Sequence, residues 1–444
     1  MPLKATFTSG STLRHVVVMS ATGAFGLMSM FMVDLIDILF LSMLDQKEVI
    51  AAVGFASSIM FFTISIGLAV SISATAMVSR AVGRGDRELA KRRATNVLIF
   101  GILLSFVIVY FLMPRIPDLL YFLGANGITL DLATSYLEIS ILGMPAIMVG
   151  MIGSGIMRAL GDAKRAMYAT LISGLVNAVL DPILIFVLDL GLDGAAFASL
   201  IARFSMVVIA YYGLVNVHKT LSPFDWLYFC QDFKKIVFIT FPAMLTNMSS
   251  PLANALVTEH MATFGDDAVA AYSIIGRIIP VVFGGLFALS GAVGPILGQN
   301  YGANNFSRMQ ETLTSAVIYS LCYCLLLCWF LYELQFWLIS IFSASIETAD
   351  LLSFFATYIS FSFFFQSLLF IGIATFNNLG SPKTSAWLNF ARATIGTWPL
   401  IVFFGCFFDA KGIFIGQALG SIIFGCIAFT LARRYIIKLE VAVS

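Results

Sequence analysis

The sequence predicts an all-α polytopic membrane protein, with twelve transmembrane helices in two six-helix lobes related by pseudo-two-fold symmetry. Three observations support this fold class. The 444 residues are 60% hydrophobic and only 11% charged, with a mean hydropathy of +0.96. Long apolar segments recur along the whole chain, and the second half repeats the pattern of the first. A soluble protein of this length needs far more polar residues to cover its surface.

Each predicted span is an apolar segment of about 20 to 30 residues that ends at a short polar turn. The first segment is too long for a cleavable signal peptide and lacks a small-residue cleavage site, so we expect it to remain as a spanning helix. In order, the predicted spans are residues 13–43, 50–79, 94–114, 130–157, 165–188, 194–217, 236–262, 268–298, 310–332, 350–378, 384–408 and 412–432.

An internal repeat divides the chain into two similar units. At an offset of 219 residues, "VSRAVGRGDRELAKRR" in the first half matches "LGQNYGANNFSRMQET" in the second, and Gly161 falls on Gly380. A unit with an even number of spans keeps its orientation when it is duplicated. We therefore predict an amino-terminal lobe over 1–218, a cytoplasmic linker over 219–235 and a carboxy-terminal lobe over 236–444.

The distribution of basic residues predicts the orientation of the chain. Of its 25 Lys and Arg residues, twenty lie at the amino terminus, in even-numbered loops, in the carboxy-terminal tail or at the adjoining span ends. Cytoplasmic loops carry the excess of positive charge, so we expect both termini in the cytoplasm. The net charge of +1 gives no indication of a nucleic-acid partner.

Two aspartates interrupt the first span, in the stretch "FMVDLIDILF". Asp34 and Asp37 stand three residues apart and therefore share one helix face. Asp37 lies about two helical turns before the outer end of the span. A charge at this depth is costly, and it indicates a functional site unless a partner neutralises it.

Polar residues of the fifth and sixth spans lie at a similar predicted depth. Asp181 follows Asn177 by four residues and precedes Pro182, while Ser199 precedes Arg203 by four residues. Carboxyl groups, an amide, a hydroxyl and a bent backbone together predict a site for a proton or Na⁺. Burial and like-charge repulsion both favour the neutral form of a carboxyl group, so protonation near neutral pH is feasible. Interacting acids would titrate as a coupled set.

The duplication provides an internal comparison for these acids. At the repeat offset Asp37 corresponds to Leu256, and with a small shift Asp181 corresponds to Trp398. If the acids served only the architecture of a six-helix unit, the second half would need them as well. Their absence there favours a function that is confined to one lobe.

Other interpretations of the buried charges are structural. Arg203 could act as a counter-ion that neutralises Asp37, and Asp34 could line a surface cavity. Arg392 is interpreted as a residue near a helix end whose side chain extends to the interface. The chain contains no GxxxxGK[ST], GxSxG or HExxH motif, and its three histidines are scattered. We therefore predict no catalytic residues, no metal site and no cofactor other than the coupling ion.

Four segments carry a family resemblance: "GLAVSISATAMVSRAVGRGD", "ILGMPAIMVGMIGSGIMRALGDAKRAM", "NAVLDPILIF" and "GPILGQNYGANN". They resemble the multidrug and toxic compound extrusion (MATE) transporters, and the resemblance covers almost the whole chain. It implies the MATE/MOP fold, in agreement with twelve spans in two lobes.

The resemblance also implies roles for individual residues. The first span of the family reads like "YNxVDxxFVG", so "MVDLIDILFLS" places Asp37 at the functional aspartate and Asp34 where Asn is common. "NAVLDP" carries over Asn177 and Asp181, and Ser199 falls where several relatives have Thr. The tenth span lacks the acid of the NorM-like branch. The sequence therefore resembles the prokaryotic DinF-like branch, whose coupling site lies in the amino-terminal lobe.

We expect a secondary active multidrug efflux transporter that exports organic cations or amphiphilic toxic compounds by alternating access. The expected coupling ion is H⁺, with Na⁺ as the alternative. We expect a monomer in a prokaryotic inner (plasma) membrane, with drugs or toxins as its small-molecule partners. Two alternatives stay open: a lipid-linked sugar flippase of the same superfamily, which often has extra spans and a basic cavity, and a membrane-embedded enzyme, which would need converging catalytic groups.

Overall fold

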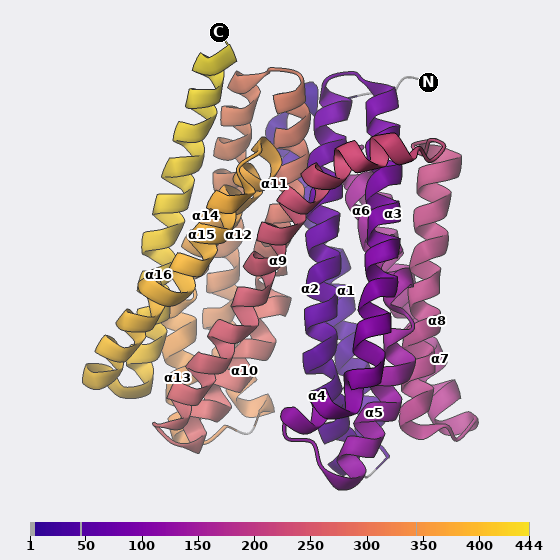
Figure 1. The fold of residues 1–444 in the computed structure, drawn as a ribbon. Coiled ribbons are helices and arrows are strands. Elements are labelled where there is room, and N and C mark those ends of the chain that lie inside the picture. The colour runs from indigo at the N-terminus through magenta and orange to yellow at the C-terminus, as the bar shows by residue number, and fades with distance from the viewer. Residues whose placement is uncertain (1–4, 45–46, 343, 444) are drawn as a thin grey trace. The chain divides into compact units, whose positions relative to one another are not determined.

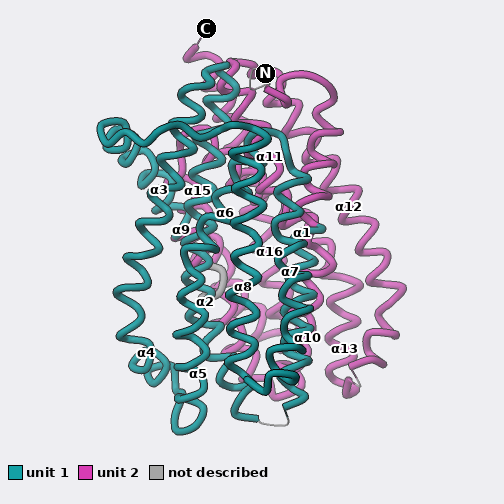
Figure 2. The backbone as a smooth tube through the Cα atoms, turned by 90° about the vertical axis from the view of Figure 1, so that its right-hand side faces the viewer, with its two compact units in different colours: residues 1–4, 25–244 teal, residues 5–24, 245–444 magenta. Residues whose placement is uncertain are grey.

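The computed structural model describes residues 5–44, 47–342 and 344–443, and within these ranges all side chains except those of residues 250–252. The described chain is helical and has no strand (Figure 1). The all-α membrane fold predicted from the sequence is thereby confirmed. Two compact units divide the chain, one containing residues 25–244 and the other containing residues 5–24 and 245–444 (Figure 2).

Two helices are shared between the units: α1 (Thr12–Ser42) and α9 (Trp226–Ala262). The first unit also contains α2 (Lys47–Gly83), α3 (Arg87–Leu112), α4 (Ile116–Phe122), α5 (Gly127–Ile141), α6 (Met144–Ala159), α7 (Ala163–Pro182) and α8 (Gly191–Tyr211). The second also contains α10 (Asp266–Val282), α11 (Gly284–Gly302), α12 (Phe306–Ile341), α13 (Ile346–Phe354), α14 (Ser362–Leu379), α15 (Pro382–Ala391) and α16 (Trp398–Val443). Short 3-10 and π-helical turns join several of them.

The number of membrane crossings agrees with the repeat. By length and composition, nine helical stretches in the described ranges could cross a membrane, and two bent pairs raise the number to eleven. The pairs are α5 with α6, bent by 49°, and α10 with α11, bent by 47°. The stretch Pro382–Val443 contains two helices, because Phe408 and Asp409 have non-helical backbone angles. Beyond this break the chain packs back on itself, with Gly416 against the backbone of Ile401. Two helices there bring the total to twelve.

The amino-terminal segment packs with the second unit, although the sequence predicts one lobe over 1–218. The buried Phe7 donates its N–H to Oε1 of Gln299 at 2.9 Å. Its carbonyl accepts from Nδ2 of Asn300 at 3.2 Å and from Nη2 of Arg308 at 3.1 Å. Backbone groups that are buried must find such partners. Because α11 and α12 supply them, residues 5–24 belong to the second unit.

The predicted linker packs as part of the first unit, through a buried carboxylate on α9. Asp232 is 0% exposed and accepts two hydrogen bonds from Arg92 of α3, from Nε at 3.1 Å and from Nη2 at 3.2 Å. Nδ2 of Asn96 donates a third at 2.9 Å. The Arg92 guanidinium also lies 4.7 Å from the ring centroid of Tyr228. This network holds the first part of α9 on α3, which extends the unit to residue 244.

A second hydrogen-bonded cluster surrounds Asp162, between α6 and α7. Asp162 precedes α7 and accepts hydrogen bonds from the backbone N–H of Arg165 at 3.2 Å and from Nε2 of His218 at 2.8 Å. The Arg165 guanidinium is its third partner. Burial alone would raise the pKa of Asp162, but the hydrogen bonds from His218 and Arg165 outweigh it and lower the pKa to about 2. These hydrogen bonds therefore hold His218, which follows the turn Tyr212–Val217, against the start of α7.

Replacing Asp162 with Asn tests the contribution of this charge, because Asn can still cap α7. A carboxyl group whose pKa falls from 3.8 to about 2 on folding contributes about 2 kcal/mol at pH values above 3.8. We expect Asp162→Asn to lower the unfolding free energy by about this amount at about pH 6. The difference should shrink as the pH falls below 3.8 and vanish near pH 2. Chemical unfolding in detergent at several pH values measures it, and a difference that does not vary with pH would refute the assignment.

Candidate ion-coupling site

Close approach of α1 and α7 builds the site, and it depends on two glycines. A Cβ at Gly26 would lie 2.8 Å from Oγ1 of Thr170 on α7. A Cβ at Gly174 would lie 3.3 Å from Oγ of Ser29 on α1. Both distances are tighter than ordinary contacts, so larger residues would force the helices apart. Two turns beyond Ser29 and Gly174, the helices carry Asp37 and Asp181 at the same level.

The carboxyl groups of Asp37 and Asp181 lie close together and interact electrostatically. A carboxylate can only accept, so a hydrogen bond between two carboxyl groups needs a proton on one of them. Asp181 is 0% exposed, and Nδ2 of Asn177 donates to its Oδ1 at 3.0 Å. Oδ1 of Asp37 and Oδ2 of Asp181 are buried, and neither has a hydrogen-bond partner in the described structure. The predicted trio of Asp37, Asp181 and Asn177 thus comes together.

The other two predicted site residues lie at the margin. Asp34 is exposed, and its carboxyl group interacts electrostatically with that of Asp37. Ser199 is half-buried on α8, and among the described residues it forms no hydrogen bond with Asp37 or Asp181. The structure therefore places Asp34 beside the paired acids and leaves the role of Ser199 as a prediction.

Arg203 does not form the ion pair considered from the sequence. Its Nη1 donates to the backbone carbonyl of Ser140, in the last turn of α5. The side chain also packs against Gly143, where a Cβ would lie 2.8 Å from the Cδ of Arg203. No carboxylate within the described ranges lies within ion-pair distance of the guanidinium. Arg203 satisfies a carbonyl at the carboxyl end of α5, where a cation also interacts favourably with the helix dipole.

Sequence reasoning missed Tyr136 on α5. The phenol lies within electrostatic range of Arg203, Asp37 and Asp181. A tyrosine in an apolar span has no distinctive pattern, and only the packing of α5 against α8 brings it to the site. A phenol hydroxyl can donate to a carboxylate and accept from a carboxylic acid, which suits either protonation state.

The backbone beyond Asp181 is irregular. α7 ends at Pro182, and the chain continues as a π-helical turn over Ile183–Val187. Proline removes an N–H donor, and π-helical turns occur frequently at functional sites. The carboxyl oxygens of Asp37 and Asp181 and the amide oxygen of Asn177 are groups that could share a proton or bind Na⁺. In the described part of the chain, no group of three or more His, Cys, Asp or Glu side chains could hold a metal ion.

Comparison with known proteins identifies the family. The family model described as MatE matches residues 24–183 and 242–403. A protein named FAD transporter, from Shewanella oneidensis, is 27% identical over 430 residues, covering 94% of this chain and 93% of that relative. The multidrug export protein MepA of Staphylococcus aureus is 26% identical over 290 residues, covering 64% of this chain and 63% of that relative.

A solved structure has the same fold. It is described as the outward-facing conformation of a multidrug resistance MATE family transporter of the MOP superfamily. It superimposes with a TM-score of 0.91 and 23% identity, covering 98% of each chain. Together with the family match over most of the chain, this establishes the relationship. The chain belongs to the MatE family of transporters, which confirms the prediction of a transporter rather than a membrane-embedded enzyme.

Proposed function

We propose that this protein is a secondary antiporter that exports amphiphilic organic compounds, organic cations among them, in exchange for protons. The observation that carries the proposal is the convergence of Asp37 and Asp181, each of which has a buried carboxyl oxygen without a hydrogen-bond partner in the described structure. Its similarity to the multidrug export protein MepA supports the substrate class. The relative named FAD transporter supports flavin nucleotides as a second candidate substrate.

In the proposed mechanism the acid pair exchanges its protons with one side of the membrane at a time. Protonation of both acids removes the last charge from the contact between α1 and α7. Loss of one proton restores a negative charge in a poorly solvated place, which favours a different packing of these helices. Alternating access would use this difference to open the substrate site to opposite sides in turn. Both termini would lie in the cytoplasm and the membrane would be the prokaryotic inner membrane.

Imposed ion gradients test the proposal. Proteoliposomes that contain the purified protein and entrapped ethidium would receive either a pH gradient or a Na⁺ gradient, each without the other. We expect a pH gradient alone to drive ethidium transport. Transport with a Na⁺ gradient alone would assign Na⁺ as the coupling ion instead. A flippase of lipid-linked sugars would transport ethidium under neither condition, and that result would refute the antiporter.

A further inference from the structure

The second unit contains a half-buried arginine for which the described residues supply no counter-ion. Arg392 follows α15 and opens a π-helical turn over Arg392–Thr397. It lies ten residues after Pro382, or about 15 Å along the helix, which is about half the thickness of a bilayer core. The interpretation of Arg392 as a helix-end residue therefore does not hold. The helix continues past it to the break at Phe408, so its charge lies near the middle of a span.

Arg392 follows a residue that binds α9. Asn389, three residues before it, donates from Nδ2 to the carbonyl of Thr246 at 2.8 Å and to Oγ of Ser249 at 2.7 Å, both on α9. Trp387 is on the opposite side and is 64% exposed.

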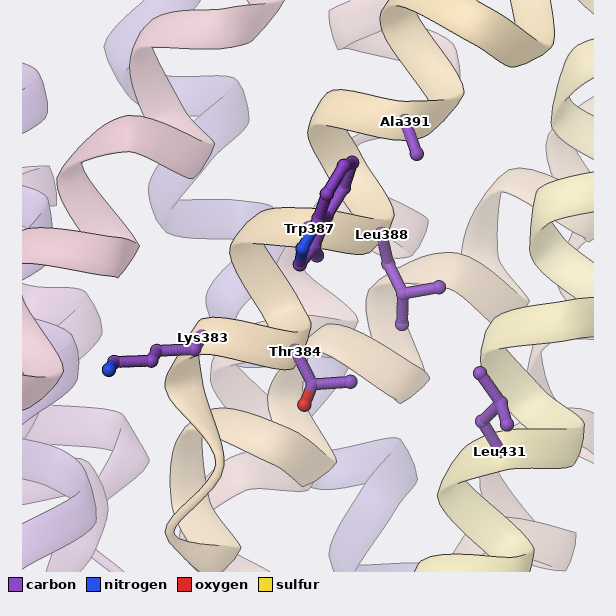
Figure 3. A pocket seen from close by; sticks show the side chains of 6 residues that line it. All are labelled: Lys383, Thr384, Trp387, Leu388, Ala391 and Leu431. Carbon is purple, nitrogen blue, oxygen red and sulfur yellow. The ribbon is translucent and has the colours of Figure 1, made fainter.

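Figure 3 shows the side of α15 that carries Trp387. An open groove of about 380 Å³ lies there. Its lining residues are Lys383, Thr384, Trp387, Leu388, Ala391 and Leu431. No acid is among them, so the groove offers Arg392 no partner. Arg392 itself is not among the lining residues.

Two hydrogen-bond donors of these helices are buried without a partner in the described structure. Nε of Arg392 is buried and has no partner, and the ion pairs of the described residues do not include its guanidinium. Nδ2 of Asn247, the residue after Thr246 on α9, is also buried without a partner. Buried donors without acceptors cost free energy, and a buried unpaired charge costs more. The first unit shows the opposite case, buried acceptor oxygens on Asp37 and Asp181.

The repeat shows that the six-helix architecture does not require this charge. At the offset of 219 residues, Arg392 corresponds to Ser173. The Oγ of Ser173 donates to the carbonyl of Ala202 on the neighbouring helix and carries no charge. An ionisable residue within a span that the fold does not need is a functional-site candidate by default.

We propose that Arg392 binds a carboxylate or phosphate group of the transported compound. The inference rests on the proposed transport function and adds amphiphilic compounds that carry an anionic group to its substrate class. A guanidinium presents two parallel N–H groups that match the two oxygens of such a group. Transporters built from repeats hold their substrates near the bilayer midplane, which is the depth of Arg392.

Riboflavin and FMN provide the test, because they differ only in a phosphate group. Binding of each to the purified full-length protein in nanodiscs is measured through quenching of flavin fluorescence. We expect the unmodified protein to bind FMN at least about tenfold more tightly than riboflavin, a ratio that corresponds to about 1.4 kcal/mol. Arg392→Gln should bring the ratio to about one, and Arg392→Lys should retain part of it. Arg434→Gln, which removes an exposed arginine of α16, is the matched control and should keep the full ratio.

A ratio near one in the unmodified protein, or an unchanged ratio in Arg392→Gln, would overturn the proposal. Equal loss of the ratio in Arg434→Gln would also overturn it, because the effect would then come from net charge. Size-exclusion profiles and melting temperatures show whether each variant is folded, and the unmodified protein tests the proposal even if Arg392→Gln does not fold. The binding measurement uses no ion gradient. Failure here therefore leaves the antiporter proposal intact, and failure of gradient-driven ethidium transport leaves the flavin result intact.

Discussion

Asp37→Asn is expected to abolish proton-driven efflux. Asn preserves the size of the side chain and can hydrogen-bond to Asp181, but it cannot take up or release a proton. Gradient-driven ethidium transport should fall by at least about tenfold, toward the level of empty liposomes, because one missing proton carrier uncouples the cycle. Binding of ethidium to the purified variant should persist, since Asn preserves the packing of α1 against α7. Transport at the wild-type rate by Asp37→Asn under a full pH gradient would refute the proposed role of Asp37 in proton coupling.

The pair predicts a specific pattern across variants. Asp181→Asn should lose as much transport as Asp37→Asn, and the double variant should lose no more, because residues that act as one unit are not additive. Asp34→Asn should lose less, because Asp34 is exposed and lies at the margin of the pair. Asp131→Asn removes an exposed acid of α5 and serves as the control with no expected loss. Additive losses from the two single variants would indicate independent acids instead of a shared proton.

The paired acids could be predicted from the sequence because the depth of a residue within its span and the offset of the repeat can both be counted along the chain. Helical rise places Asp37 and Asp181 at similar depths from span ends, and the repeat shows that their counterparts Leu256 and Trp398 carry no charge. Asn177 followed from its spacing of four residues on the same helix. These arguments need only the position of each residue within its own span.

Contacts between helices could not be predicted in the same way. The partner of Arg203 is a backbone carbonyl of α5, and every residue has a carbonyl, so no residue type marks it. Arg392 was misinterpreted because its depth depends on where the eleventh span begins and on which side of α15 faces α9. The two compact units differ in extent from the predicted lobes because Phe7 and Asp232 find their partners on helices that are distant in the sequence. Hydrogen bonds of this kind follow from packing, which a hydropathy pattern does not specify.

Asp232→Ala is expected to cause the largest loss of stability. The substitution leaves the Arg92 guanidinium and the Asn96 amide without their buried acceptor. Removing one partner of a buried ion pair typically costs 3–5 kcal/mol, and we expect about 3 kcal/mol here. The lower end applies because the Arg92 side chain is 24% exposed and water can solvate part of it. The melting temperature in detergent measures the loss, and faster tryptic cleavage near Lys235 would show that the start of α9 has left α3.

Two further variants separate this network from charge effects in general. Glu88→Ala breaks the ion pair between Glu88 and Lys91 on α3. The Glu88 side chain is 76% exposed, so the loss of unfolding free energy should be no more than about 0.5 kcal/mol. The double variant Arg92→Met with Asp232→Leu removes both buried charges together and should be more stable than Asp232→Ala. The cost in Asp232→Ala is the desolvation of an unpaired guanidinium, which the double variant no longer contains. If Asp232→Ala destabilises no more than Glu88→Ala, water reaches Arg92 freely, and the network does not hold α9 on α3.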